Sequence, residues 1–133
     1  MKIVISTAYS FYVDDEICKQ LILNNSSCIV RYDAETYYKG KFHPDLEGAK
    51  EFATDMGDGV SKIGRNYFFH EDDVCYFSYG DKARTNEEFI SLLNDDNIGR
   101  LKIIDIPKDI NFHIIKSERG EIIKEIIPFR TWG

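Results

Sequence analysis

The sequence predicts an α+β fold, with an antiparallel or mixed β-sheet and two to three helices packed on it. Short runs rich in β-branched and aromatic residues occur from the start of the chain to its end. Between these runs, apolar residues recur every three to four positions, as on one face of a helix. The two kinds of segment do not alternate regularly, as they do in parallel βαβ sheets. A chain of 133 residues is predicted to form one domain over residues 1–133.

A strand and a helix are predicted to open the chain. Residues 2–7, KIVIST, are rich in β-branched side chains and predict the first strand. Residues 13–25 predict a helix, because acidic residues crowd its first turn and four apolar side chains share one stripe. These four side chains, expected in the core, are Ile17, Cys18, Leu21 and Ile22.

The next segments predict two extended pieces and a second helix. Residues 27–33 and 36–42, SCIVRYD and TYYKGKF, are rich in residues that favour strands. Residues 43–57 predict a helix, with Pro44 near its start and Gly57 as a left-handed cap at its end. Its apolar face is expected to contain Leu46, Ala49, Ala53 and Met56.

A loop, a hairpin and a third helix are predicted to follow. Residues 57–66, GDGVSKIGRN, contain three glycines and predict a loop. Residues 67–80 read as two strands on either side of an acidic turn, which is typical of a hairpin. Residues 85–96 predict a helix, because Thr85 as N-cap and Glu88 three residues later form a capping box.

Three strand-like runs end the chain. Residues 101–107, 111–117 and 121–127 are rich in isoleucine and are separated by short polar links, one of which contains Gly120. Links of this length favour antiparallel neighbours. The sequence therefore predicts a three-stranded antiparallel meander at this end.

Charge and cysteine content restrict the classes of partner. The net charge of −6 is uneven: residues 44–99 contain thirteen acidic and five basic side chains, whereas residues 100–133 have a net charge of +2. Binding to generic nucleic acid needs a strongly positive face, so it is not expected. The sequence contains no apolar run near the roughly 20 residues of a membrane helix and no signal-peptide pattern. An odd number of cysteines without C-x-x-C spacing fits a reducing cytoplasm.

Catalytic and metal-binding motifs are weak. Residues 59–66, GVSKIGRN, approximate a phosphate-binding loop, but Arg65 replaces its lysine and Asn66 its hydroxyl residue. Residues 70–73, HEDD, are adjacent on a hairpin tip, so their side chains point apart rather than toward one ion. Glu121 and Glu125 would lie roughly 13 Å apart on a strand, too far to act together on one bond. We therefore predict no metal, no cofactor and no catalytic residues, and the sequence favours a protein that is not an enzyme.

Arginine and aromatic residues are the predicted ligand-binding groups. Arg84 precedes a predicted helix N-terminus, and helix N-termini are favourable binding positions for phosphate. Arg130 and Trp132 would share one face of an extended tail, so that one could hold a phosphate while the other stacks on a base. Trp132 could also act as a plug that pins the last strand to the core. The further candidates are Arg31, Arg65, Arg119 and Tyr9.

Both ends of the chain carry a resemblance to a known family. The opening MKIVISTAYSFYVDDEICKQLI and the closing LKIIDIPKDINFHIIKSERGEIIKEIIPFRTWG resemble a widespread family of small bacteriophage proteins. Members of that family start with a MKIVI-type strand and end with an IP-D strand, a glycine turn and an Arg-x-Trp terminus. Many have a histidine directly before the closing arginine, where this chain has Phe129. An acid–base role for that position is therefore not expected here.

The resemblance implies a phage accessory protein in the host cytoplasm, and small phage proteins of this kind include ones that counter host defence. Our first hypothesis is a protein that binds and sequesters a small nucleotide signal, such as a cyclic dinucleotide or an ADP-ribose derivative, without catalysis. Sequestration favours enclosed sites between subunits, so a homo-oligomer is expected. The second hypothesis is an inhibitor that binds a host defence protein through the acidic residues 44–99. The third is a nucleotide-processing enzyme.

Overall fold

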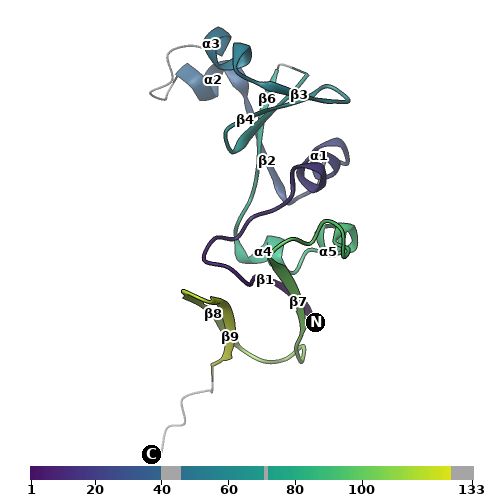
Figure 1. Ribbon diagram of the computed structural model, residues 1–133, viewed down its shortest axis with the longest axis vertical. Coiled ribbons are helices and arrows are strands. Elements are labelled where there is room, and N and C mark those ends of the chain that lie inside the picture. Colours follow the sequence, from purple (N-terminus) through teal and green to yellow (C-terminus); the bar gives the residue numbers. More distant parts are fainter. Residues whose placement is uncertain (40–45, 71, 127–133) are drawn as a thin grey trace, which may run out of the picture. The chain divides into compact units, whose positions relative to one another are not determined.

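A computed structural model describes residues 1–39, 46–70 and 72–126 of the protein (Figure 1). It confirms the α+β class: the strands form one five-stranded sheet and two two-stranded sheets, all antiparallel, accompanied by short helices. Contacts divide the chain into two compact units. The first unit comprises residues 1–14 and 84–133, and the second comprises residues 15–83. The single domain over residues 1–133 stays a prediction.

The first unit contains two strand pairs. Strand β1 pairs with β7, in a register that sets Lys2 opposite Asp105 and Ser6 opposite Leu101. Strands β8 and β9 form a hairpin closed by the turn between Ser117 and Gly120. The elements of this unit are β1 (Lys2–Ser6), α5 (Glu87–Leu92), β7 (Leu101–Asp105), β8 (Phe112–Ser117) and β9 (Gly120–Glu125). Its buried side chains include Ile3, Val4, Ile5, Phe89 and Leu101.

The second unit is built around the five-stranded sheet, whose strand order is β2-β6-β5-β4-β3. Its helices are α1 (Asp15–Leu23), α2 (Ala34–Lys39) and α3 (Leu46–Glu51), and α4 (Asp81–Arg84) ends at the boundary between the units. Its strands are β2 (Ile29–Asp33), β3 (Thr54–Gly57), β4 (Val60–Ile63), β5 (Asn66–Phe69) and β6 (Asp73–Phe77). The predicted first helix and the predicted hairpin, β5–β6, are confirmed.

Helices cover both faces of this sheet. Neighbouring residues of a strand point to opposite faces. Phe68 of β5 packs with Ala34 and Ala49 from the segments of α2 and α3, whereas the hydroxyl of Tyr67 donates to Asp15 at the start of α1. The four predicted core residues of α1, Ile17, Cys18, Leu21 and Ile22, are all buried.

The prediction of an extended segment over residues 36–42 was wrong where the structure describes it. Residues 34–39 form helix α2 instead. Asp33 accepts hydrogen bonds from the backbone nitrogen and the hydroxyl of Thr36, at 3.0 and 3.2 Å. This is the geometry of an N-cap, and it starts a helix despite the strand-favouring tyrosines that follow.

Residues 43–66 also depart from prediction. The helix ends at Glu51, so Ala53 and Met56 lie beyond it, and residues 60–63 form strand β4 instead of a loop. The glycines mark two tight turns on either side of this short strand. Gly57, the last residue of β3, and Gly59, in the turn to β4, have positive φ values of 85° and 80°, and Gly64 has a φ of 58° between β4 and β5.

Two smaller predictions are corrected in the first unit. The N-cap of α5 is Asn86 rather than Thr85, because the Asn86 side chain accepts from the Phe89 backbone nitrogen at 2.9 Å. The predicted meander is only partly present: β8 and β9 pair, but β7 pairs with β1, about 100 residues away in the sequence. Local spacing cannot reveal so distant a partner.

Candidate binding sites

A buried ion pair joins Arg84 to the β8–β9 hairpin. The two terminal nitrogens of Arg84 donate to Oε1 and Oε2 of Glu121 at 2.7 and 2.6 Å. The side chains are only 13% and 7% exposed. Glu121 Oε1 also accepts from the backbone nitrogen of Ser6 at 2.7 Å, so one carboxylate ties β9 to both β1 and the end of α4. The Arg84 guanidinium further lies 4.6 Å from the centre of the Phe11 ring.

The ion pair keeps Glu121 ionised. Burial raises the pKa of Glu121, but the hydrogen bonds from Arg84 and Ser6, together with the Arg84 charge, outweigh it and hold the pKa below its usual value. Two parallel N–H bonds to a carboxylate are the same fork that arginine offers to a phosphate. A phosphate could therefore use Arg84 only by displacing Glu121.

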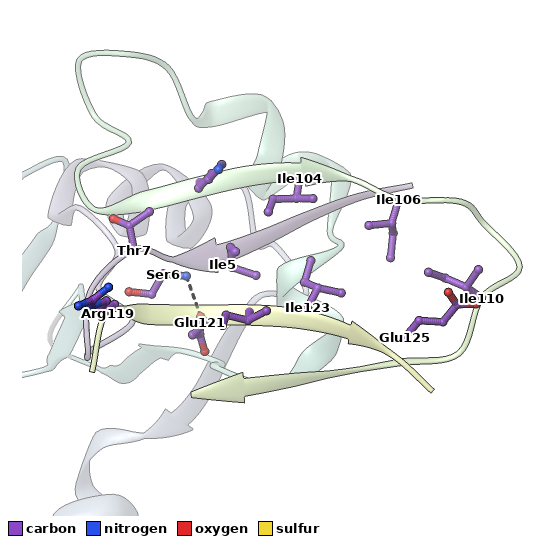
Figure 2. Close-up of a pocket in the computed structure, with 12 residues that line it drawn as sticks. Ile5, Ser6, Thr7, Ile104, Ile106, Ile110, Arg119, Glu121, Ile123 and Glu125 are labelled. Atoms are coloured by element: carbon purple, nitrogen blue, oxygen red, sulfur yellow. Dashed lines mark hydrogen bonds between the residues drawn. The ribbon is translucent and has the colours of Figure 1, made fainter. Parts of the chain in front are cut away.

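A groove of about 490 Å³ lies next to this ion pair (Figure 2). Its walls come from β1, β7, β9 and the links that follow β7 and β8. The aliphatic part of the lining consists of Ile5, Ile104, Ile106, Ile110, Ile122 and Ile123. The polar part consists of Ser6, Thr7, Lys102, Arg119, Glu121 and Glu125. No aromatic ring is among these twelve described residues, so the groove has no stacking platform of its own.

Gly120 fixes the end of the hairpin against β1. A Cβ atom at this position would lie 2.8 Å from the carbonyl oxygen of Ser6 and from the carbonyl carbon of Thr7. Both contacts are with backbone, which cannot move aside as a flexible side chain can. The φ of 112° at Gly120 is also unfavourable for any residue with a side chain. One end of the groove is therefore held by a backbone contact as well as by the Glu121 hydrogen bonds.

Charges are separated along the groove. Lys102 lies opposite Ile5 in the β1–β7 register, toward the Ser6 end, and Arg119 directly precedes Gly120. Figure 2 shows Arg119 beside Thr7 at one end, and Glu125 beside Ile110 at the other. The described residues give no ion-pair partner to Lys102, Arg119 or Glu125. The groove thus has a cationic end, an aliphatic middle and an anionic end.

A second cavity of the first unit, which we call the amino-terminal pocket, has a volume of about 650 Å³. It is lined by Met1, Lys2, Thr85, Glu87, Ile90, Ser91 and Lys108. Lys2 and Lys108 are exposed and have no ion-pair partner in the described part of the chain. The pocket therefore combines two cationic side chains with two hydroxyls, the carboxylate of Glu87 and an apolar wall.

A polar cluster in the second unit has a structural role. The carboxylate of Asp15 accepts from the Tyr67 hydroxyl at 2.7 Å and from Lys62 Nζ at 2.8 Å, which holds the start of α1 on the sheet. Burial, together with the neighbouring Cys18 and Asp15, raises the pKa of Tyr67 far above its usual range. A phenol that holds its proton this firmly is a poor acid–base catalyst at neutral pH.

The predicted ligand-binding residues that the structure describes are divided between the two units. Arg84, Arg119 and Tyr9 belong to the first unit, and the ring of Tyr9 lies 4.5 Å from Lys116 Nζ. The other candidates in the described ranges, Arg31 and Arg65, belong to the second unit. Arg130 and Trp132 lie outside the described residues.

The two arginines of the second unit differ in their surroundings. Arg31 donates to the Ile22 carbonyl oxygen, lies 3.8 Å from Asp73 and sits 5.0 Å from the centre of the Phe69 ring. These contacts anchor β2, so the guanidinium is already engaged. Arg65 is exposed in the turn between β4 and β5.

The sequence did not point to Lys2, Lys102 or Lys108, and it indicated Arg119 only as one of several arginines that could bind an anion. Each is an isolated basic residue, and only the pairing of β1 with β7 and the position of the hairpin place them around cavities. The glycine turn that precedes Glu121 was noticed in the sequence, but nothing there indicated its contact with β1. The signal that could have suggested a groove is the density of isoleucine over residues 101–127.

Comparisons add no family to this geometry. Searches against protein families, curated proteins and solved structures find no match to this chain. Within the described ranges, no group of three or more His, Cys, Asp or Glu residues is arranged to hold a metal ion. No helix in the described part of the chain has the length and apolar character needed to cross a membrane.

Proposed function

We propose that the protein is a phage accessory protein that binds a small nucleotide-type signalling molecule in the host cytoplasm without transforming it. The amino-terminal pocket is the proposed binding site. The observation that carries the proposal is the presence of two unpaired lysines, Lys2 and Lys108, on one cavity of about 650 Å³ among the described residues. A volume of this size falls within the range of small-ligand sites, roughly 300–1,000 Å³.

Five of the seven lining residues match parts of a nucleotide, whereas the carboxylate of Glu87 matches none of its phosphates. Lys2 and Lys108 supply compact positive charges for phosphate oxygens. The hydroxyls of Thr85 and Ser91 are of the type that hydrogen-bonds to a ribose, and Ile90 offers an apolar surface to a base. In this proposal Arg84 has a supporting role: it stays bound to Glu121 and precedes Thr85 in the chain.

The proposal of binding without catalysis is supported by the residue types of this pocket. The described residues that line it include neither His nor Cys, the side chains most suited to proton transfer or nucleophilic attack near neutral pH. The phage context comes from the resemblance at the two ends of the chain. A homo-oligomer that closes the open side of the pocket is part of the proposal, since enclosure strengthens small-ligand binding.

Isothermal titration calorimetry against cyclic dinucleotides and ADP-ribose derivatives tests the proposal. We expect one of these ligands to bind, and the Lys2→Glu/Lys108→Glu variant to bind it at least about tenfold more weakly, or about 1.4 kcal/mol. Lys124→Glu is the matched control, because Lys124 is exposed on the hairpin and lines neither cavity. Ligand recovered intact after denaturing the protein distinguishes sequestration from hydrolysis. No heat with any member of the panel contradicts the proposal.

A second candidate function is inhibition of a host defence protein through an acidic surface. The observation that favours it is the charge of the second unit, which has thirteen acidic and eight basic side chains over residues 15–83, a net charge of −5. A salt-sensitive complex that is lost when acidic residues of this unit are neutralised would support it over the nucleotide proposal.

A further inference from the structure

We infer that the groove between β1, β7 and β9 is a docking site for an extended segment of a partner protein. The segment that fits has an acidic side chain at one end, aliphatic side chains in its middle and a basic side chain at its other end. The inference concerns a different cavity from the proposed nucleotide site and does not depend on it.

The aliphatic lining favours a protein segment over a nucleotide. Six isoleucines from three segments of the first unit line one groove, and four of them, Ile104, Ile106, Ile110 and Ile123, are only partly buried. Covering a side chain of this size removes apolar surface from water and contributes roughly 1.5–3 kcal/mol when burial is complete. A base would find no ring to stack on among the described lining residues, whereas Val, Ile or Leu side chains match the surface in shape and polarity.

The separated charges define the orientation and chemistry of the partner. Lys102 and Arg119 stand near the Ser6 end, and Glu125 stands at the other end, beside Ile110 (Figure 2). None of these three has an ion-pair partner among the described residues, so each is available to an incoming charge. Charge complementarity of this kind fixes the register of a complex and excludes segments of the opposite polarity.

The length of the groove sets the length of the segment. Glu121 and Glu125 both line it and are four residues apart on β9, which corresponds to roughly 13 Å at the rise of a strand. An extended segment of about five residues spans this distance. Its acidic end would face Lys102 and Arg119, and its basic end would face Glu125.

The groove is built to be rigid at its cationic end. The Arg84–Glu121 pair, the Glu121–Ser6 hydrogen bond and the Gly120 contact with β1 all hold the hairpin there. A preformed site loses less conformational entropy on binding than one that must be ordered first. A short segment that makes few contacts can therefore still bind with measurable affinity.

Two fluorescein-labelled peptides test the inference with the full-length chain. One has the order Asp-Ile-Val-Ile-Lys and the other the reverse order, because the chain direction of the segment is open. We expect at least one to show saturable binding by fluorescence polarisation below about 1 mM. Lys102→Glu/Arg119→Glu is expected to weaken that binding at least about tenfold, and a peptide with its Asp replaced by Lys is expected to restore binding to this variant.

The controls separate this inference from a general charge effect and from the nucleotide proposal. Lys124→Glu and Lys2→Glu/Lys108→Glu are expected to bind the peptide like the wild type. Circular dichroism spectra and melting temperatures check whether these exposed substitutions leave the fold intact. The inference is overturned if neither peptide binds, if Lys124→Glu weakens binding as much as the double variant, or if a peptide with serines in place of its aliphatic residues binds equally well.

Discussion

Replacing Arg84 with methionine is expected to lower the free energy of unfolding of the first unit by about 3 kcal/mol. The substitution removes the charge that faces Glu121 but keeps a side chain of similar length against the Phe11 ring. Glu121, only 7% exposed, then loses two hydrogen bonds of 2.7 and 2.6 Å. Removing one partner of a buried ion pair costs about 3–5 kcal/mol. The hydrogen bond from Ser6 remains, so we expect the lower end of this range.

A double-mutant cycle that adds a substitution of Glu121 gives a sharper test than Arg84→Met alone. Glu121→Gln in the Arg84→Met background removes the orphaned charge and keeps an oxygen that can accept from Ser6. We expect this double variant to lie within about 1 kcal/mol of the wild type, because replacing both members of a buried pair is often nearly neutral. The second mutation should therefore stabilise the first variant, although Glu121→Gln alone should destabilise the wild type.

Urea unfolding followed by circular dichroism measures these differences, with linear extrapolation to zero denaturant. Hydrogen exchange in peptides that cover residues 1–14 and 112–126 assigns the loss to β1 and the hairpin. If Arg84→Met lowers the free energy of unfolding by less than about 1 kcal/mol, the loss is that expected for a surface ion pair, and the role given to the buried pair is refuted. A double variant less stable than Arg84→Met would refute it as well.

Three further predictions follow from single observations. The pKa of Glu121 is held below its ordinary value of 4.5, so the stability that its ionised form contributes is present above that pH and is lost as the pH falls through the folded pKa. In an acid titration, the free energy of unfolding of Glu121→Gln should therefore fall less steeply than that of the wild type. Gly120→Ala should lower the melting temperature more than Gly99→Ala, because both glycines have positive φ but only a Cβ atom at residue 120 would contact backbone atoms. Equal losses of melting temperature would contradict this. Iodoacetamide at about pH 8 should label the three cysteines only after unfolding, since all three are buried and burial raises the pKa of Cys75 to about 11. Rapid labelling of the native protein would contradict this expectation.

Local patterns predicted the elements whose signals are contained in one stretch of sequence. The strand over residues 2–6, the stripe of α1 and the strands of the C-terminal hairpin follow from periodicity and β-branched content. The errors came from signals that have two meanings. The glycines of residues 57–64 were interpreted as a loop, but they provide two turns around a four-residue strand. A single Asp33 cap decided the conformation of the tyrosine-rich segment that follows it.

The sites depend on partners that sequence spacing does not reveal. Arg84 was predicted to bind a phosphate because it precedes a helix N-terminus, yet its guanidinium is bound by Glu121, 37 residues away in the sequence. Lys2 and Lys108 line one pocket only because β1 pairs with β7 across the chain. Interactions between distant residues determine which charges are satisfied internally and which remain for a ligand.

Chemical-shift mapping by nuclear magnetic resonance tests the central claim most directly. The isotope-labelled chain is titrated with each cyclic dinucleotide and ADP-ribose derivative, and amide shifts are followed to saturation. We expect the shifts to be concentrated at Lys2, at residues 85–91 and at Lys108, the segments that form the amino-terminal pocket. Shifts confined to the second unit, or no saturable shifts with any ligand, would contradict it.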